Sequence, residues 1–187
     1  MSGWRKKRGI MRRYDLTAHL YDMRYAEEQT AKYEAALESL KTERLGRVLD
    51  VGCGTGLLFT HIANRAELIV GLDISKKTLL KAKQNTTNFP NVCLVQADCD
   101  WLPFQLGVFD HVFAVTLIQN APKPVDTLNE IKRVTSEKAA VVVTGLKRVF
   151  QLECFRKLLE DVGLNVEVMK DEDNLKCHVA VCVKMNH

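Results

Sequence analysis

Apolar and polar residues alternate along the chain with two different spacings. Seven short apolar runs rich in β-branched residues predict strands at 46–51, 68–74, 91–98, 109–118, 139–146, 165–171 and 177–185. Around them, apolar positions at helical spacing predict helices at 25–41, 56–65, 75–86, 124–134 and 149–163. This interleaving is typical of an α/β protein whose parallel sheet is covered on both faces.

Local signals set the ends of several elements. Ser75 stands where a helix N-cap is expected, Pro124 suits a first helical turn, and Gly163 suits a helix end. Only the five residues 172–176 join the last two strands, too few for a parallel crossover. We therefore expect these two strands to form an antiparallel hairpin, unlike the βαβ ending of a nicotinamide-binding domain.

Length and composition indicate one ordinary globular domain. The chain has 187 residues, of which 47% are apolar and 27% are charged. No apolar run approaches the roughly 18 residues of a membrane-spanning helix, and no apolar stretch of a secretory signal follows the basic start. We expect a cytoplasmic protein without a membrane span. Its six cysteines include no CxxC pair, which favours structural thiols over a metal site.

The positive charge is confined to one end of the chain. The formal net charge is +4, and the first 13 residues alone contribute +6. The composition predicts a basic, flexible arm at 1–13 ahead of a near-neutral domain at 14–187. Such an arm suits binding of a polyanion such as RNA, or is simply a solvated terminus.

A glycine-rich loop, "DVGCGTG" at 50–56, follows the first strand. In the dinucleotide fingerprint G-x-G-x-x-G the following helix faces a pyrophosphate, but here the third glycine comes one residue early. Asp50, two residues before the first glycine, would repel a pyrophosphate and suits a ligand with a positive centre. Asp73 and Asp98 end the next two strands, where an open α/β sheet binds ligands. Together they favour a nucleoside without phosphate.

These segments resemble the motifs of a known family. "VLDVGCGTG", "VGLDIS", "ADCDWLPF" and "FDHVFAVTLIQN" stand in the order and spacing of the class I S-adenosylmethionine-dependent methyltransferases, nearest to the ubiquinone/menaquinone-biosynthesis-like branch. The resemblance implies a doubly wound, mostly parallel sheet of seven strands in the order 3-2-1-4-5-7-6. It also implies S-adenosyl-L-methionine as cofactor, S-adenosyl-L-homocysteine as product, no metal, and a helical lid at 14–44.

The same resemblance assigns roles to single residues. Asp73 would bind the ribose hydroxyls, Asp98 the adenine amino group, and Asp50 would lie near the ligand's ammonium. The remaining expected cofactor contacts are the loop residues Gly52, Cys53, Gly54 and Gly56, the adenine neighbours Ile74 and Cys99, and Tyr21 on the lid. Alternatives stay open, since Gly56 also suits close helix packing and Asp98 also suits a turn.

Transfer of a methyl group from a sulfonium needs alignment and exclusion of water more than a covalent nucleophile. Gln119 and Asn120 follow the fourth strand, where Asn120 either orients an N or O acceptor or merely starts a helix. For a hydroxyl acceptor, His19 and Asp22 on the lid are the candidate bases.

No inserted cap follows the fifth strand, so the cleft is expected to be open. An open cleft beside a basic arm favours an RNA or protein substrate over a metabolite. The third strand, an expected sheet edge, is apolar enough for a small activator protein to add a strand there. A small-molecule methyltransferase, a catalytically silent cofactor-binding subunit and a nicotinamide oxidoreductase remain alternatives.

Overall fold

The computed structural model describes residues 3–185, except the side chains of residues 13, 14 and 16–25. The helices are α1 (Gly3–Ser39), α2 (Phe59–Ile62), α3 (Lys76–Asn85), α4 (Pro124–Val134) and α5 (Leu152–Asp161). The strands are β1 (Gly46–Val51), β2 (Ala66–Asp73), β3 (Val92–Gln96), β4 (Phe109–Ala114), β5 (Thr135–Leu146), β6 (Leu164–Lys170) and β7 (Cys177–Lys184).

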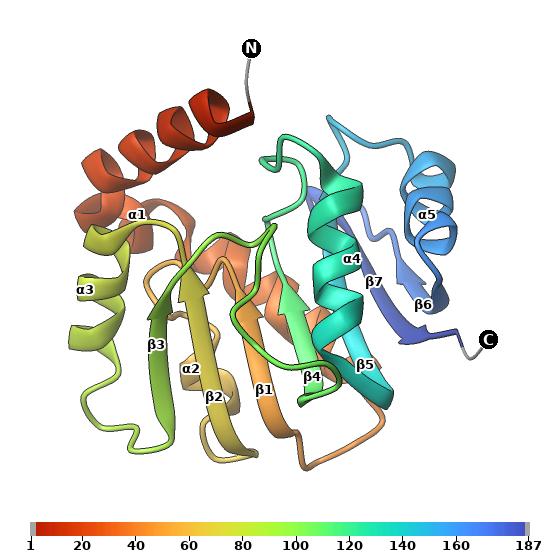
Figure 1. Ribbon diagram of the computed structural model, residues 1–187, viewed down its shortest axis with the longest axis horizontal. Helices are drawn as coiled ribbons and strands as arrows, with labels where there is room; N and C mark the ends of the chain where they lie inside the picture. Colours follow the sequence, from red (N-terminus) through yellow and green to blue (C-terminus); the bar gives the residue numbers. More distant parts are fainter. Residues whose placement is uncertain (1–2, 186–187) are drawn as a thin grey trace.

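The strands form one sheet in the order β3-β2-β1-β4-β5-β7-β6 (Figure 1). The first five strands in this order pair in parallel, whereas β7 pairs antiparallel with both β5 and β6. The predicted fold class, strand order and terminal hairpin are confirmed. Because the parallel strands share a direction, β1, β2, β3 and β4 all end at the same edge of the sheet.

Helices bury both faces of this sheet. Apolar residues of α4 and α5, such as Ile131 and Phe155, pack with Leu49 and Val141 on one face. The second half of α1, with α2 and α3, packs on the other face around Phe113. In Figure 1, α4 and α5 lie in front of the sheet and the later turns of α1 lie behind it.

Several local predictions are confirmed by the backbone. Ser75 is extended and its hydroxyl accepts a hydrogen bond from Thr78 N, so it caps α3. Pro124 opens α4 as its first residue. The fourth strand is shorter than predicted, because it ends at Ala114 and the chain turns at once through Thr116, whose φ is +59°.

A flexible arm was predicted at 1–13, but the described residues of this segment form a helix. Gly3 already begins α1, so the basic segment continues the helix that was predicted from residue 25. The physical reason is tertiary: Lys7 and Ile10 lie against a cavity of the sheet, and Lys7 pairs with acidic residues there. The neighbouring Arg, Lys and Met residues are good helix formers.

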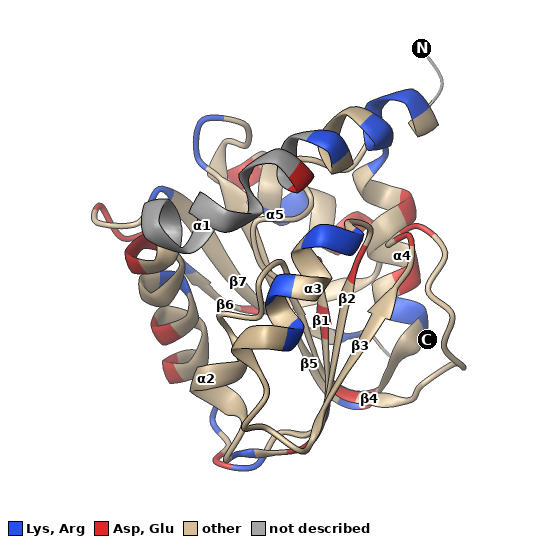
Figure 2. Cartoon of the chain, turned by 90° about the vertical axis from the view of Figure 1, so that its left-hand side faces the viewer, with Lys and Arg blue, Asp and Glu red and all other residues tan. Residues whose placement is uncertain are grey.

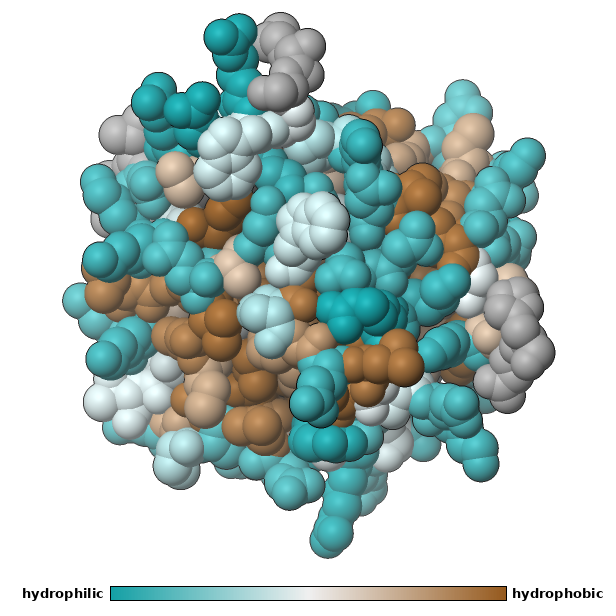
Figure 3. Space-filling view, viewed as in Figure 1, coloured by the Kyte–Doolittle hydropathy of each residue, from teal (hydrophilic) through white to brown (hydrophobic). Residues whose placement is uncertain are grey.

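A further irregularity lies between β3 and β4. Residues 97–108 connect these strands without a helix, so the front face of β2 and β3 has only a loop over it. Leu68 and Val95 are partly buried there, and Cys93 and Leu106 are exposed. Figure 3 shows hydrophobic side chains gathered over this part of the sheet. None of the helices in the described part of the chain combines the length and apolar character needed to cross a membrane.

Candidate active site

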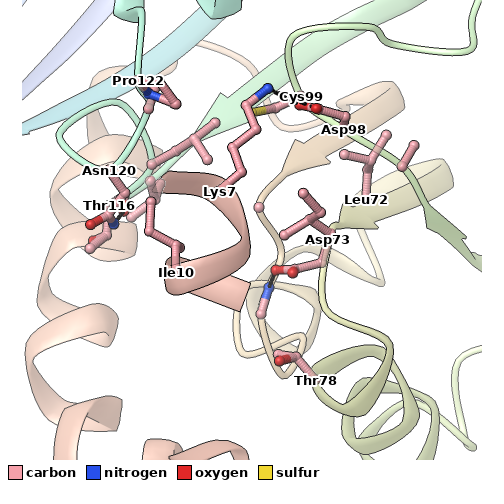
Figure 4. A pocket seen from close by; sticks show the side chains of 17 residues that line it. Lys7, Ile10, Leu72, Asp73, Thr78, Asp98, Cys99, Thr116, Asn120 and Pro122 are labelled. Carbon is pink, nitrogen blue, oxygen red and sulfur yellow. Dashed lines mark hydrogen bonds and ion pairs between the residues drawn. The ribbon is translucent and has the colours of Figure 1, made fainter. Parts of the chain in front are cut away.

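A cavity of about 850 Å³, including its open mouth, lies at the carboxyl ends of β1, β2, β3 and β4. Lys7 and Ile10 of α1 close one side of it, and the segments after the four strands form the rest (Figure 4). The cavity therefore joins residues from across the first two thirds of the chain.

The glycine loop forms the cavity's inner wall. Gly52 N and Cys53 N both donate to Leu72 O, at 2.7 and 3.0 Å, which fastens the loop to the end of β2. Gly52 and Gly54 have φ values of +77° and +56°, the left-handed region that favours glycine. A Cβ on Gly54 would meet nothing within 4 Å, so this backbone presents an open face on which a ligand can lie closely.

Asp73 is fixed at the end of β2 by backbone amides. Its Oδ2 accepts from Gly54 N at 3.1 Å and its Oδ1 accepts from Ser75 N at 2.8 Å. Burial raises the pKa of Asp73, although hydrogen bonds from the amides of Ser75, Gly54 and Ile74 oppose the rise. A carboxylate has about four acceptor positions, so these amides leave capacity for a further donor.

Asp98 forms an ion pair with Lys7, which lies near the start of the chain. Lys7 Nζ donates to Asp98 Oδ1 at 2.5 Å and Oδ2 at 2.7 Å, and also pairs with Asp100. Burial alone would lower the pKa of Lys7, but hydrogen bonds and charges from Asp100 and Asp98 raise it, so the ammonium persists. Asp98, Cys99 and Asp100 are also close enough to hold a metal ion, and the Lys7 ammonium lies among them.

Asp50 lies beneath the loop and lines neither described cavity. Its exposed fraction is 3%, and burial, reinforced by the charge of Asp73, raises its pKa to about 8. At neutral pH this carboxyl group is therefore mostly protonated in the free protein. A positive ligand group nearby would favour its ionised form.

The turn after β4 is held by hydrogen bonds from several elements. Thr116 Oγ1 accepts from Lys32 Nζ and from Gln29 Nε2 of α1, both at 3.2 Å, and Thr116 N donates to Thr144 Oγ1 at 2.8 Å. Asn120 Nδ2 donates to Thr116 O at 3.1 Å. These contacts hold a threonine in the left-handed region, which costs of order 1–3 kcal/mol.

Seven of the predicted site residues line the cavity together: Gly52, Gly54, Asp73, Ile74, Asp98, Cys99 and Asn120. Cys53 instead lines a small neighbouring cavity with Gln29 and Tyr33. A Cβ on Gly56 would lie 2.9 Å from Phe59, so this glycine serves the packing of α2. The side chains of His19, Tyr21 and Asp22 lie outside the described residues.

Gln119, predicted beside Asn120, does not line the cavity. Its Nε2 and Oε1 are buried, and neither has a hydrogen-bond partner among the described residues. An unpaired buried amide costs about 1–3 kcal/mol, so the burial of this side chain needs a partner from elsewhere or a compensating contact.

Lys7, Ile10 and Thr116 were not predicted as site residues. With Gly3, Lys7 and Ile10 recur at i, i+4 and i+7, which places them on one helix face but does not show what that face contacts. Thr116 carries no such signal, because its role arises from a turn inside an apolar run that reads as strand.

Proteins similar to this chain include methyltransferases. A family model described as "Methyltransferase domain" matches residues 49–143. Malonyl-[acyl-carrier protein] O-methyltransferase of Marinomonas sp. is 31% identical over 76% of this chain and 53% of its own length. Demethylmenaquinone methyltransferase of Staphylococcus carnosus is 32% identical over 52% of this chain and 42% of its own. The chain thus spans about half the length of the curated relatives it matches.

A solved structure also has this fold. It is the complex between the Haloferax volcanii Trm112 methyltransferase activator and the putative methyltransferase, matched with a TM-score of 0.81 at 18% identity. The match covers 92% of this chain and 98% of that chain. At this identity the likeness concerns the fold alone.

Proposed function

The chain belongs to the methyltransferase domain family, and on this premise we propose that it transfers a methyl group from S-adenosylmethionine to an N or O atom of a macromolecule. The observation that carries the proposal is the convergence of the glycine loop, Asp73 and Asp98 on one cavity. When bound there, the cofactor supplies an electrophilic methyl group on a positively charged sulfur.

Each wall of the cavity has a distinct task in this proposal. Asp73 accepts the two ribose hydroxyls while the amides of Gly54 and Ser75 keep its carboxylate oriented. Asp98 accepts the adenine amino group, with Ile74 and Cys99 beside the ring. The glycine loop allows close approach of the methionine part, and Asp50 beneath it balances the ammonium charge.

At the other end of the cavity, the turn after β4 receives the acceptor. Asn120 is fixed to Thr116 O, so its carboxamide can orient an acceptor N or O atom without rearranging. Gln119, His19 and Asp22 remain proposed contributors, the last two as bases for a hydroxyl acceptor. The α1 residues Lys7 and Ile10 exclude water from the adenine end.

A macromolecular acceptor is favoured by the surroundings of the cavity. Only the five residues between Leu146 and Leu152 connect β5 to α5, so no inserted cap stands over this end. Exposed cations of α1 lie beside the mouth. The names of the two relatives favour a second candidate, a small molecule or a carrier-bound acyl group, as acceptor.

The decisive test begins with binding of S-adenosylhomocysteine, measured by calorimetry. We expect Asp73→Asn to weaken this binding at least about tenfold, because charged hydrogen bonds to the ribose are lost. Asp126→Asn, at an exposed acid of α4, is the matched control and should bind as the unaltered protein does. Equal binding by both variants would contradict the proposed site.

Transfer is then followed with tritiated S-adenosylmethionine and RNA, protein and small-molecule fractions. Label in RNA or protein supports the proposal, and label only in small molecules supports the second candidate. Tight binding without any incorporation identifies a catalytically silent subunit, and a response to NAD instead identifies an oxidoreductase.

We also propose that a small activator protein pairs with β3. This strand is the edge of the sheet, and the loop-covered face beside it is apolar. The Haloferax volcanii structure with the same fold is described as a complex of the Trm112 methyltransferase activator with the putative methyltransferase, which supports the proposal. An added strand would cover the open edge and the exposed Cys93 together.

A further inference from the structure

The first three turns of α1 present two different faces. At 100° per residue, Gly3, Lys7 and Ile10 fall on one stripe, and this stripe faces the cavity. The opposite stripe consists of Arg5, Arg8 and Arg12, all exposed. Because Lys7 faces the sheet, the three guanidinium groups on the opposite face of the helix point into solvent beside the mouth of the cavity.

Two exposed indole rings stand near members of the same ion pair in the sequence. Trp4 lies one helical turn before Lys7 and is 52% exposed, and Trp101 directly follows Asp100 and is 80% exposed. They are the only tryptophans in the sequence. Tryptophan is usually well buried, so two exposed indoles beside one cavity indicate a ligand for their flat faces.

The charges around these rings favour an anion. Residues 3–12 contain five cations and no acid, and Figure 2 shows Lys and Arg residues along the start of α1 with acidic residues lower in the view. Lys7 offsets one of the two negative charges of Asp98 and Asp100, which weakens their repulsion of a phosphate chain. Arg5, Lys6, Arg8 and Arg12 have no acidic partner among the side chains that the structure describes.

We propose that Trp4, Arg5, Arg8, Arg12 and Trp101, here called the rim surface, bind single-stranded RNA. The inference rests on the proposed function and names its substrate class. The guanidinium groups would contact phosphates and the indoles would stack on unpaired bases. Bases in a duplex are already stacked on each other, which excludes double-stranded RNA as the preferred ligand.

A membrane surface fits the rim surface less well. An interfacial helix needs a continuous apolar stripe opposite its cations. In residues 3–12 Lys7 and Ile10 face the cavity, and the exposed positions other than Trp4 are Arg, Lys or Gly. Isolated rings among cations are the pattern of a base-stacking site.

The experiment measures binding of a fluorescein-labelled, mixed-sequence single-stranded RNA of about 20 nucleotides to the full chain at several salt concentrations. For the triple variant Arg5→Ala, Arg8→Ala, Arg12→Ala we expect weaker binding and a log–log salt slope smaller by about 2. Trp101→Ala should weaken binding about tenfold, and Trp101→Phe should restore most of it. The matched control is Lys41→Ala, Arg44→Ala, Lys157→Ala, which removes as many exposed cations elsewhere and should keep the original slope.

Several results would overturn the proposal. Two concern the variants: an equal loss of RNA affinity in the control triple variant, or unchanged RNA affinity in Trp101→Ala. Two concern the ligand: binding of an RNA duplex of the same length as tightly as the single strand, or displacement of the RNA by phosphatidylserine vesicles or polyglutamate of equal charge. Binding of S-adenosylhomocysteine is measured on the same samples. If S-adenosylhomocysteine binds and RNA does not, only the RNA inference is contradicted. If S-adenosylhomocysteine does not bind, the proposed function is contradicted, whatever the RNA result.

Discussion

Asp50 is the residue whose protonation is most altered by the fold. Its pKa is about 8 instead of its ordinary 3.8, because burial disfavours its charge and Asp73 adds repulsion. The folded protein therefore holds a proton that the unfolded chain releases near pH 4. Its contribution to stability is complete below that pH and is lost progressively as the pH rises through 8.

We accordingly expect Asp50→Asn, which cannot ionise, to be more stable than the unaltered protein at high pH. At pH 8 its midpoint of thermal unfolding should be higher by about 3 °C or more, and the difference should vanish near pH 4. The same variant should bind S-adenosylhomocysteine less tightly, because the ligand's ammonium loses its counter-charge. Thermal unfolding from pH 4 to 9 measures the first effect, and a difference independent of pH would refute it.

Single residues differ in how far sequence reveals them. Asp73, Ile74, Asp98 and Cys99 could be predicted to share a site because they end parallel strands, whose direction the pattern fixes. Lys7 could not, because its place depends on a contact with Asp98 over 91 residues of chain. Gly56 looked like a loop residue of the site, but its neighbour Phe59 determines its role.

At the scale of elements, the first turns of α1 are the part least expected from composition. Six cations near one end suggest a solvated arm, and only docking of Lys7 and Ile10 makes a helix there favourable. Short helices without tertiary contacts are marginal in water. The stability of these turns therefore depends on the Lys7 ion pairs.

Replacing Lys7 by Met should release this part of α1 while leaving the core folded. We expect backbone amides of residues 3–12 to exchange with solvent at least about tenfold faster, because two partly buried acids lose their cation. Lys6→Met is the control, since Lys6 makes only a 3.3 Å contact with Ala121 O. Unchanged protection of residues 3–12 in Lys7→Met would show that other contacts hold the helix.

At the scale of the whole molecule, the alternation of strands and helices was sufficient to predict the layers of the fold. The short connection at 172–176 was sufficient to predict the terminal hairpin. The ends of β4 and α2 were not predictable, because an apolar run continues past the point where tertiary contacts turn the chain. The sheet order then leaves β3 with one open edge. Ile69 N bonds Asn91 O and Ala97 N bonds Asp73 O, so by alternation Leu94 directs its own N–H and C=O outward.

Leu94→Pro should therefore block an added strand while keeping the pairing of β3 with β2. With the Haloferax volcanii Trm112 activator as probe, we expect the unaltered chain to co-elute in size-exclusion chromatography and this variant to elute alone. Leu94→Ala, which keeps the outward N–H, is the control and should still co-elute. A stable, monodisperse monomer with no co-elution would count against the activator proposal.

The placement of the two tryptophans gives the protein a built-in optical probe. Trp4 precedes Lys7 by one turn of α1 and Trp101 directly follows Asp100, and both rings are exposed. Since the sequence contains no other indole, all tryptophan fluorescence originates at this rim. Emission colour and quenching should therefore report binding at the rim surface, without an attached dye and without a signal from the core.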